Sequence, residues 1–267
     1  MLSSFLQSLH IGAWDILLIT VVSLQATVMA YLYAPKWKAL MISLPIPFTI
    51  SAMAVGRQVD ITNVLGFVLL VMFTHGVRIL HSHLRLPIIA SIVIAALGYC
   101  GIGWGLAKVT PNGEAAFWIA CITVFLAAVL LFMFSPHRDE PGHREPLPVW
   151  IKLPLTVLVT IALVLMKKGL HGFMTVFPLV GVFAAYEARR SLWTISRQIP
   201  VVVITMMPMV VVSRVTQPFV GLGLSLFFAW IAFLLVFIPT FIVMWRKADK
   251  DVAQVNVAAD SPAVIHG

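Results

Sequence analysis

Residues 115–134 read AAFWIACITVFLAAVLLFMF, a run of twenty residues without a single charged side chain. A helix of about 20 apolar residues spans the hydrocarbon core of a bilayer, so this stretch predicts a transmembrane helix. The whole chain has the same character, since 61% of its residues are hydrophobic and 10% are charged. A soluble globule of 267 residues needs a larger polar shell. The composition therefore predicts an integral membrane protein with almost no soluble domain.

Other apolar segments of spanning length flank this one and predict an all-α polytopic bundle of about nine transmembrane helices. The predicted helices are 11–33, 39–55, 61–80, 86–107, 115–134, 149–166, 170–186, 199–215 and 219–245. Two alternatives remain open: helix 199–215 could be re-entrant, and helix 219–245 could be two short segments broken at Pro239. The predicted organisation is a first membrane half, a cytoplasmic linker, a second membrane half and a disordered cytoplasmic tail, at 1–134, 135–148, 149–245 and 246–267.

The basic residues predict the orientation of this bundle. With the N-terminus outside, thirteen of the eighteen Lys and Arg residues fall in inside loops, as expected when positive loops stay in the cytoplasm. We therefore expect a multi-pass protein of the bacterial inner (cell) membrane with a cytoplasmic C-terminus. The net charge of +8 is explained by these loops, so no nucleic-acid partner is expected. Cys100 and Cys121 lie in apolar runs, which argues against a disulfide framework, and the stretch MLSSFLQSLH has no features of a cleavable signal peptide.

Two segments in opposite halves share a pattern that indicates an internal repeat. KALMISLPIPFTISAMAVG (38–56) has Pro47 beside Phe48, and HGFMTVFPLVGVFAAYE (171–187) has Phe177 beside Pro178. The first four helices then correspond to the last four, and an odd connecting helix, 115–134, makes the two copies inverted. Inverted repeats with interrupted helices are typical of secondary transporters. Chance similarity is the alternative, because Pro is frequent in membrane helices.

Residues 150–212 resemble the small bacterial inner-membrane proteins of the GlpM type. The shared features are Lys152 at the start, an aliphatic helix ending in the basic pair Lys167 and Lys168, a Gly172–Phe173 step, and Phe177–Pro178 before a second apolar helix. The first half departs from this pattern, with LPIPF in place of a single Phe-Pro. The resemblance implies a layout of two such units fused in opposite orientation, and it brings no molecular activity with it.

Polar side chains within the first helix are candidates for a substrate path. Gln25 lies at its middle, and Thr20, Ser23 and Thr27 share one face. The alternative is interhelical hydrogen bonding, which such residues commonly provide in membranes. Asp15 lies one turn into the same helix and is a further path candidate, with an interfacial carboxylate as the alternative reading.

The third helix carries His75, which could move protons near neutral pH and is also a path candidate. Arg78 follows one turn later, and Glu187 lies at the same predicted depth at the end of helix 170–186. These two residues are candidates for an inner gate formed by an ion pair, against the alternative of a static surface pair. No metal site or cofactor is expected, because neither carboxylate nor thiolate accompanies the histidines.

Prolines and glycines predict the shape of the helices. The predicted kinks are at Pro45, Pro47, Pro178, Pro208 and Pro239, where freed backbone groups need partners or a wet cavity. Gly101 and Gly105 form a GxxxG pair that predicts a close helix–helix contact.

Nucleotide-binding and hydrolase motifs are missing from the sequence, so ATP-driven transport within this chain is unsupported. Three functions remain: a secondary transporter or permease for a small molecule or ion, a structural or assembly protein, and a membrane enzyme acting on lipid. A central, polar-lined cavity that includes Gln25 or His75 would favour the first, and a closed dry bundle the second. Convergence of a His and a carboxylate at one membrane surface would favour the third. The substrate, the coupling ion and the oligomeric state stay open.

Overall fold

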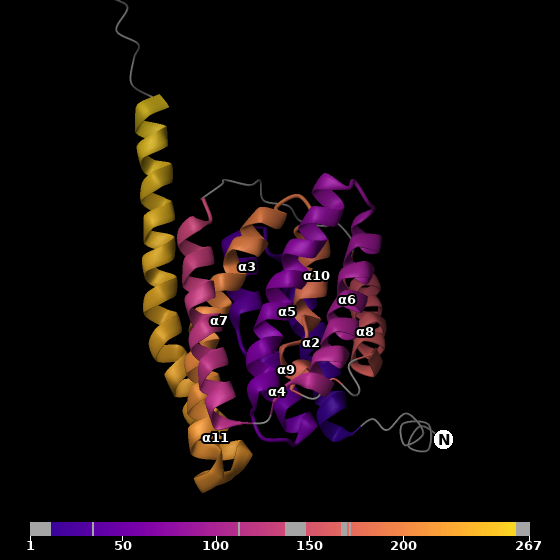
Figure 1. Ribbon diagram of the computed structural model, residues 1–267. Coiled ribbons are helices and arrows are strands. Elements are labelled where there is room, and N and C mark those ends of the chain that lie inside the picture. The colour runs from indigo at the N-terminus through magenta and orange to yellow at the C-terminus, as the bar shows by residue number, and fades with distance from the viewer. Residues whose placement is uncertain are drawn as a thin grey trace, which may run out of the picture.

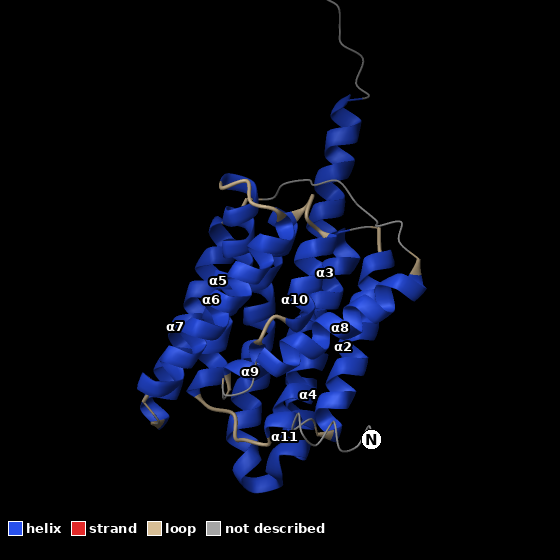
Figure 2. Ribbon diagram, turned by 90° about the vertical axis from the view of Figure 1, so that its right-hand side faces the viewer, coloured by secondary structure: helices blue, strands red, loops and turns tan. Residues whose placement is uncertain are grey.

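The computed structural model describes residues 12–33, 35–111, 113–136, 148–166, 170 and 172–259, and all the regular structure in them is helical (Figure 1, Figure 2). The bundle begins with α2 (Ala13–Tyr31), α3 (Pro35–Ser43), α4 (Ile46–Val55) and α5 (Ile61–Arg78), which one π-helical turn (Ile79–His83) extends. It continues with α6 (Ile88–Val109), α7 (Glu114–Phe134) and α8 (Val149–Met166). The last elements are α9 (Phe173–Val176), α10 (Leu179–Glu187) and α11 (Leu192–Ala259).

Six helices in the described residues are long and apolar enough to cross a membrane, which is consistent with an integral membrane protein. They include the composite Trp37–Val55 and the 52-residue stretch Leu192–Val243, and two shorter apolar helices accompany them, Val149–Leu165 and Phe173–Glu187. Many large apolar side chains point outward, such as Phe219 at 86% exposure. Such an apolar surface suits lipid rather than water.

Two of the helices are interrupted near their middle by proline. The first interruption separates α3 from α4 at Leu44 and Pro45, and Pro47 lies in the first turn of α4. A proline in the first turn is tolerated because the N–H that it lacks would have no helical partner there. The break thus lies at Pro45, one of the two prolines predicted to kink this helix, and two residues before the other, Pro47. The second interruption separates α9 from α10 at Phe177 and Pro178, where we predicted a kink.

The long helix α11 doubles back on itself at Gly221 (Figure 1). Gly221 has a φ of 74°, a left-handed conformation that glycine adopts without strain. Ser213 Oγ lies 3.5 Å from Ser225 Oγ, whereas twelve residues of straight helix would separate them by about 18 Å. We call the two parts the first arm and the second arm of α11. Helical φ and ψ continue through Pro208 in the first arm, so this predicted kink does not interrupt the helix.

The second arm stays helical as far as Ala259, beyond residue 246, where we expected a disordered tail to begin. The physical reason is local: from residue 246 to residue 259 the sequence holds neither Gly nor Pro, and eight of these fourteen residues are Ala, Lys, Arg or Gln, which favour helix. The predicted linker lies mostly outside the described residues.

Helix α5 is the centre of the bundle and packs against α6, α7, α9 and α11. It begins at a capping box, in which Asp60 accepts from Thr62 N and Asn63 accepts from Asp60 N. The described start of α2 and the end of α11 lie at opposite ends of the bundle (Figure 1). The second interrupted helix packs directly against α5 through α9, and α4 of the first interrupted helix packs against α9.

Candidate functional site

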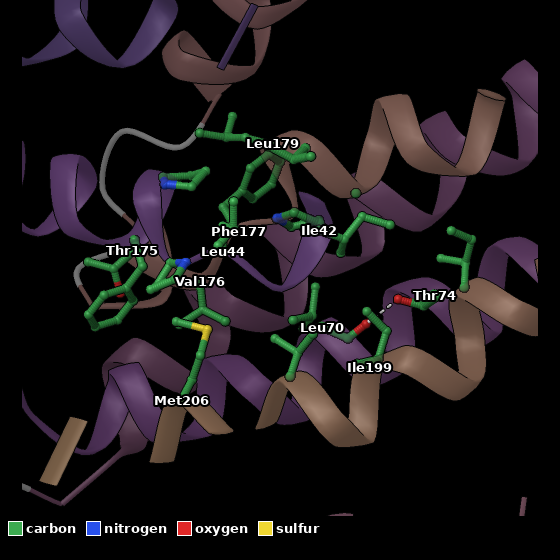
Figure 3. A pocket seen from close by; sticks show the side chains of 18 residues that line it. Ile42, Leu44, Leu70, Thr74, Thr175, Val176, Phe177, Leu179, Ile199 and Met206 are labelled. Carbon is green, nitrogen blue, oxygen red and sulfur yellow. Dashed lines mark hydrogen bonds between the residues drawn. The ribbon is translucent and has the colours of Figure 1, made fainter. Parts of the chain in front are cut away.

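The two interruptions face one cavity of about 70 Å³, which we call the central cavity (Figure 3). Leu44 and Pro45 line it from the first interruption, and Phe177 and Pro178 line it from the second. Thr74 of α5 and Ile199 and Met206 of α11 complete its wall. Among the described lining residues, the polar side chains are Thr74 and Thr175, and there is no charged one. Binding in this cavity therefore depends on hydroxyls and on backbone groups that the interruptions release.

The backbone released at the first interruption is held by Gln25. Pro45 has no N–H, so the Met41 carbonyl four residues earlier lacks its helical partner. Gln25 Nε2 of α2 donates to this carbonyl at 2.6 Å. Gln25 is 7% exposed, and its Oε1 is buried without a hydrogen-bond partner among the described residues. Gln25 thus lies behind the interruption and keeps one acceptor available, but neither Gln25 nor His75 is among the described residues that line the central cavity.

The second interruption is held in a comparable way by Tyr99 of α6. Its hydroxyl donates to the Phe173 carbonyl at 2.9 Å. Its ring packs edge-on against Phe177 at a centroid distance of 5.2 Å. Sequence reasoning missed Tyr99, although a hydroxyl within a predicted span is one of the few groups able to satisfy released carbonyls.

Asn63 is a second residue that sequence reasoning missed. It is 2% exposed, and its Nδ2 donates to Thr175 Oγ1 at 2.8 Å, which fixes α9 against α5. The approach is so close that a Cβ on Gly172 would lie 2.1 Å from Thr62 Oγ1. Only glycine fits here, because real Cβ contacts under about 3 Å do not occur between well-packed atoms. This contact fixes one wall of the central cavity.

The predicted stripe on α2 faces α8, away from the central cavity. Ser23 Oγ donates to Thr160 Oγ1 at 3.3 Å, and Thr27 Oγ1 lies 3.3 Å from Thr156 Oγ1. We call these two contacts the α2–α8 ladder. Thr20 is exposed, and its hydroxyl bonds to the Ile16 carbonyl. The contacts of Ser23 and Thr27 are those of the alternative given for this stripe, interhelical hydrogen bonding.

The other two path candidates lie apart from the central cavity. Asp15 is in the first turn of α2, where its Oδ2 accepts from Gly12 N at 3.2 Å in a helix cap. His75 is half-buried in α5, one residue beyond Thr74, and its Nδ1 lies 3.1 Å from the Val71 carbonyl. A role of either residue in transport remains a prediction.

The two gate candidates lie in different contacts. Glu187 Oε1 forms an ion pair with Lys152 Nζ of α8 at 3.2 Å, in place of the partner Arg78 that we expected. Arg78 lies over the Trp193 ring, 4.4 Å from its centroid. Lys38 Nζ donates to the Glu187 backbone carbonyl at 3.2 Å. Two lysines and one glutamate are therefore buried together at one end of the bundle.

A polar pocket of about 550 Å³ lies at the other end of the bundle, where α7 begins. Arg57, Asp60, Glu114 and Arg214 line it, and Arg214 forms an ion pair with Glu114. In the described part of the chain, no group of three or more His, Cys, Asp or Glu is placed to hold a metal ion.

Comparisons with known proteins give no relative: no family model matches the chain, and neither does any curated protein or solved structure.

Proposed function

We propose that this protein is a secondary transporter or permease that moves a small solute through the central cavity. The observation that carries the proposal is that two proline-interrupted helices from opposite halves of the chain line one cavity. In transporters built from inverted repeats, interrupted helices meet near the bilayer midplane, and their released backbone groups bind the substrate.

A constant separation in sequence supports the repeat. Pro178 follows Pro45 by 133 residues (178 − 45). The same separation matches α2 to α8, the α3–α4 pair to the α9–α10 pair, α5 to the first arm of α11, and α6 to the second arm. It also matches four further pairs of residues that line the central cavity: Ile42 with Thr175, Leu44 with Phe177, Pro47 with Val180, and Phe48 with Gly181. The central cavity thus lies where the two copies meet.

The α2–α8 ladder supports an inverted relation between the copies. Adding 133 to Ser23 gives Thr156, and adding 133 to Thr27 gives Thr160. The observed contacts are Ser23 with Thr160 and Thr27 with Thr156, so exchanging the copies turns each contact into the other. This self-complementary pairing is what a two-fold axis between α2 and α8 produces. The two helices run antiparallel, and the axis therefore lies across them, in the plane of the membrane.

The matched helices also favour nine spans, four in each copy and α7 as the connector. An odd number of crossings agrees with the opposite locations of the start of α2 and the end of α11 (Figure 1). With the N-terminus outside, the lysines of the buried group at Glu187 lie on the cytoplasmic side, as positive loops do. The pocket at Arg214 then lies on the outer side.

Two near-equivalent copies give a mechanism for alternating access. In one state the two copies adopt two different conformations, and in the other state they exchange these conformations. The central cavity then opens to one side of the membrane in the first state and to the other side in the second. At about 70 Å³ the central cavity holds only a very small solute, which fits a nearly closed state between the two openings. Its hydroxyls and backbone groups suit a solute recognised by hydrogen bonds, in the absence of a charged side chain among the described lining residues.

The test is access to the central cavity from both membrane sides, and it needs no knowledge of the substrate. Cys100 and Cys121 are first replaced by Ala, and a single cysteine is then introduced by Thr74→Cys or by Val180→Cys. Alternating access predicts labelling by a membrane-impermeant thiol reagent in right-side-out and in inside-out vesicles, because reaction requires a hydrated thiolate. Ala128→Cys is the matched control, since Ala128 is 3% exposed and lies away from the cavity on α7.

Labelling of both cavity positions from both sides, with the control unlabelled, supports transport. Labelling from one side alone, or from neither, overturns the proposal and favours a structural or assembly role.

A further inference from the structure

A second cavity opens on the flank of the bundle, between α2, α6, α8 and α10, and we call it the lateral groove. Its volume is about 450 Å³, and nearly all of its wall is apolar, for example Ala26, Ile92 and Leu155. The charged side chains among the described lining residues, Lys152 and Glu187, stand at one end. An apolar channel that ends in buried charges is suited to an amphiphile.

The length of the lateral groove corresponds to one leaflet of a bilayer. Along α8 its wall extends from Lys152 to Leu163, and eleven residues of helix rise about 16 Å. This is about half of the 30 Å hydrocarbon thickness. Lys152 lies in the first turn of α8 and Glu187 is the last residue of α10, so the charged end is at the edge of the bundle. A lipid has the same order, with its headgroup at the edge and its chain toward the midplane.

The charges at this end define the headgroup. Lys152 gives one N–H to Glu187 Oε1, and the ammonium group keeps further donors for another acceptor. Glu187 Oε2 is buried and has no hydrogen-bond partner among the described residues. An unmatched buried acceptor is costly, so the site calls for a ligand that donates a hydrogen bond to it. The ligand must thus accept from an ammonium and donate to a carboxylate.

We propose that the lateral groove binds a phospholipid with a primary-amine headgroup, that is, an ethanolamine phospholipid. Its phosphate accepts from Lys152 Nζ, its ammonium donates to Glu187 Oε2, and an acyl chain lies along the apolar wall. A choline headgroup has no N–H to donate. A glycerol headgroup has hydroxyls that can donate, but it lacks the cation that makes the stronger, charge-assisted hydrogen bond to Glu187. This site is separate from the central cavity, so the proposal of lipid binding can be tested independently of the proposal of transport.

The test is native mass spectrometry of the full-length protein in detergent with added lipids. Ethanolamine and choline phospholipids with identical acyl chains are compared in separate titrations. We expect the ethanolamine lipid to bind about tenfold more tightly, as one hydrogen bond between charged groups implies. Glu187→Gln should remove this preference, and Lys152→Met should weaken both lipids about tenfold, because the phosphate contact is common to them.

Two further variants separate a local effect from misfolding. Glu114→Gln makes the same change in the ion pair with Arg214 at the other end of the bundle, and it should leave binding unchanged. Val159→Trp should fill the lateral groove, leave the ion pair in place and abolish binding of both lipids. Equal affinity of the unsubstituted protein for the two lipids overturns the proposal, and so does a Glu187→Gln variant that keeps the preference. A dimer that buries the groove and excludes lipid would also overturn it, since the occupant is then a second copy.

Discussion

Gln25 Nε2 lies 2.6 Å from the carbonyl oxygen of Met41, the carbonyl that Pro45 leaves without a helical partner. The interruption between α3 and α4 and the polar residue at the centre of α2 are therefore one structural unit. Pro45 opens the backbone, and Gln25 makes the opened backbone stable in an apolar environment.

Replacing Gln25 by Leu should therefore destabilise the protein. The Met41 carbonyl would be buried without a donor, which costs about 1–3 kcal/mol. Equilibrium unfolding in detergent measures the loss, with Gln58→Leu as the control, because Gln58 is exposed. If the two substitutions have equal effects, the Gln25–Met41 contact contributes no more than an exposed side chain.

Sequence patterns located the interruptions but not the groups that stabilise them. A proline within an apolar run predicts a break from local chemistry alone, and both Pro45 and Pro178 lie at one. Which side chain supplies the missing donor depends on which helices are neighbours. Asn63 and Tyr99 were overlooked for that reason.

The same limit explains the partner of Glu187. Arg78 and Lys152 both lie near the predicted depth of Glu187. Which of them forms the ion pair with Glu187 depends on how α5, α8 and α10 are arranged, and depth alone does not give that arrangement. Likewise the pair Gly101 and Gly105 predicted a close helix contact, whereas a Cβ at either position would meet no neighbour within 4 Å in the described part of the chain. A pattern of small residues permits a contact, but it does not show that one is made.

Replacing Gly172 by Ala should be severe. The added Cβ would lie 2.1 Å from Thr62 Oγ1 and 2.9 Å from Asn63 N, so α9 would have to move away from α5. Overpacking of this kind costs about 1–3 kcal/mol or more. Thermal unfolding in detergent should show a lowered midpoint. Gly98→Ala on α6 is the control, because its Cβ would meet open space, and a similar loss there would point to a general intolerance of alanine.

Gly221→Ala should weaken the reversal between the two arms of α11. The φ of 74° at Gly221 strains any residue with a Cβ, by about 1 kcal/mol. We expect a lower unfolding midpoint and a longer mean distance between spin labels placed on the two arms. Gly223→Ala two residues later has no positive φ and should leave both measurements unchanged. If Gly221→Ala also changes neither, the reversal does not depend on glycine.

The α2–α8 ladder allows a quantitative test of the proposed repeat. Double-mutant cycles with valine substitutions should give a coupling energy of about 0.6 kcal/mol for Ser23 with Thr160, typical of interhelical hydrogen bonds in membranes. Copies related by a two-fold axis make the two contacts equivalent, so the cycle for Thr27 with Thr156 should give the same coupling within error. Unequal couplings for the two observed contacts would remove the symmetry argument and leave transport resting on the central cavity alone.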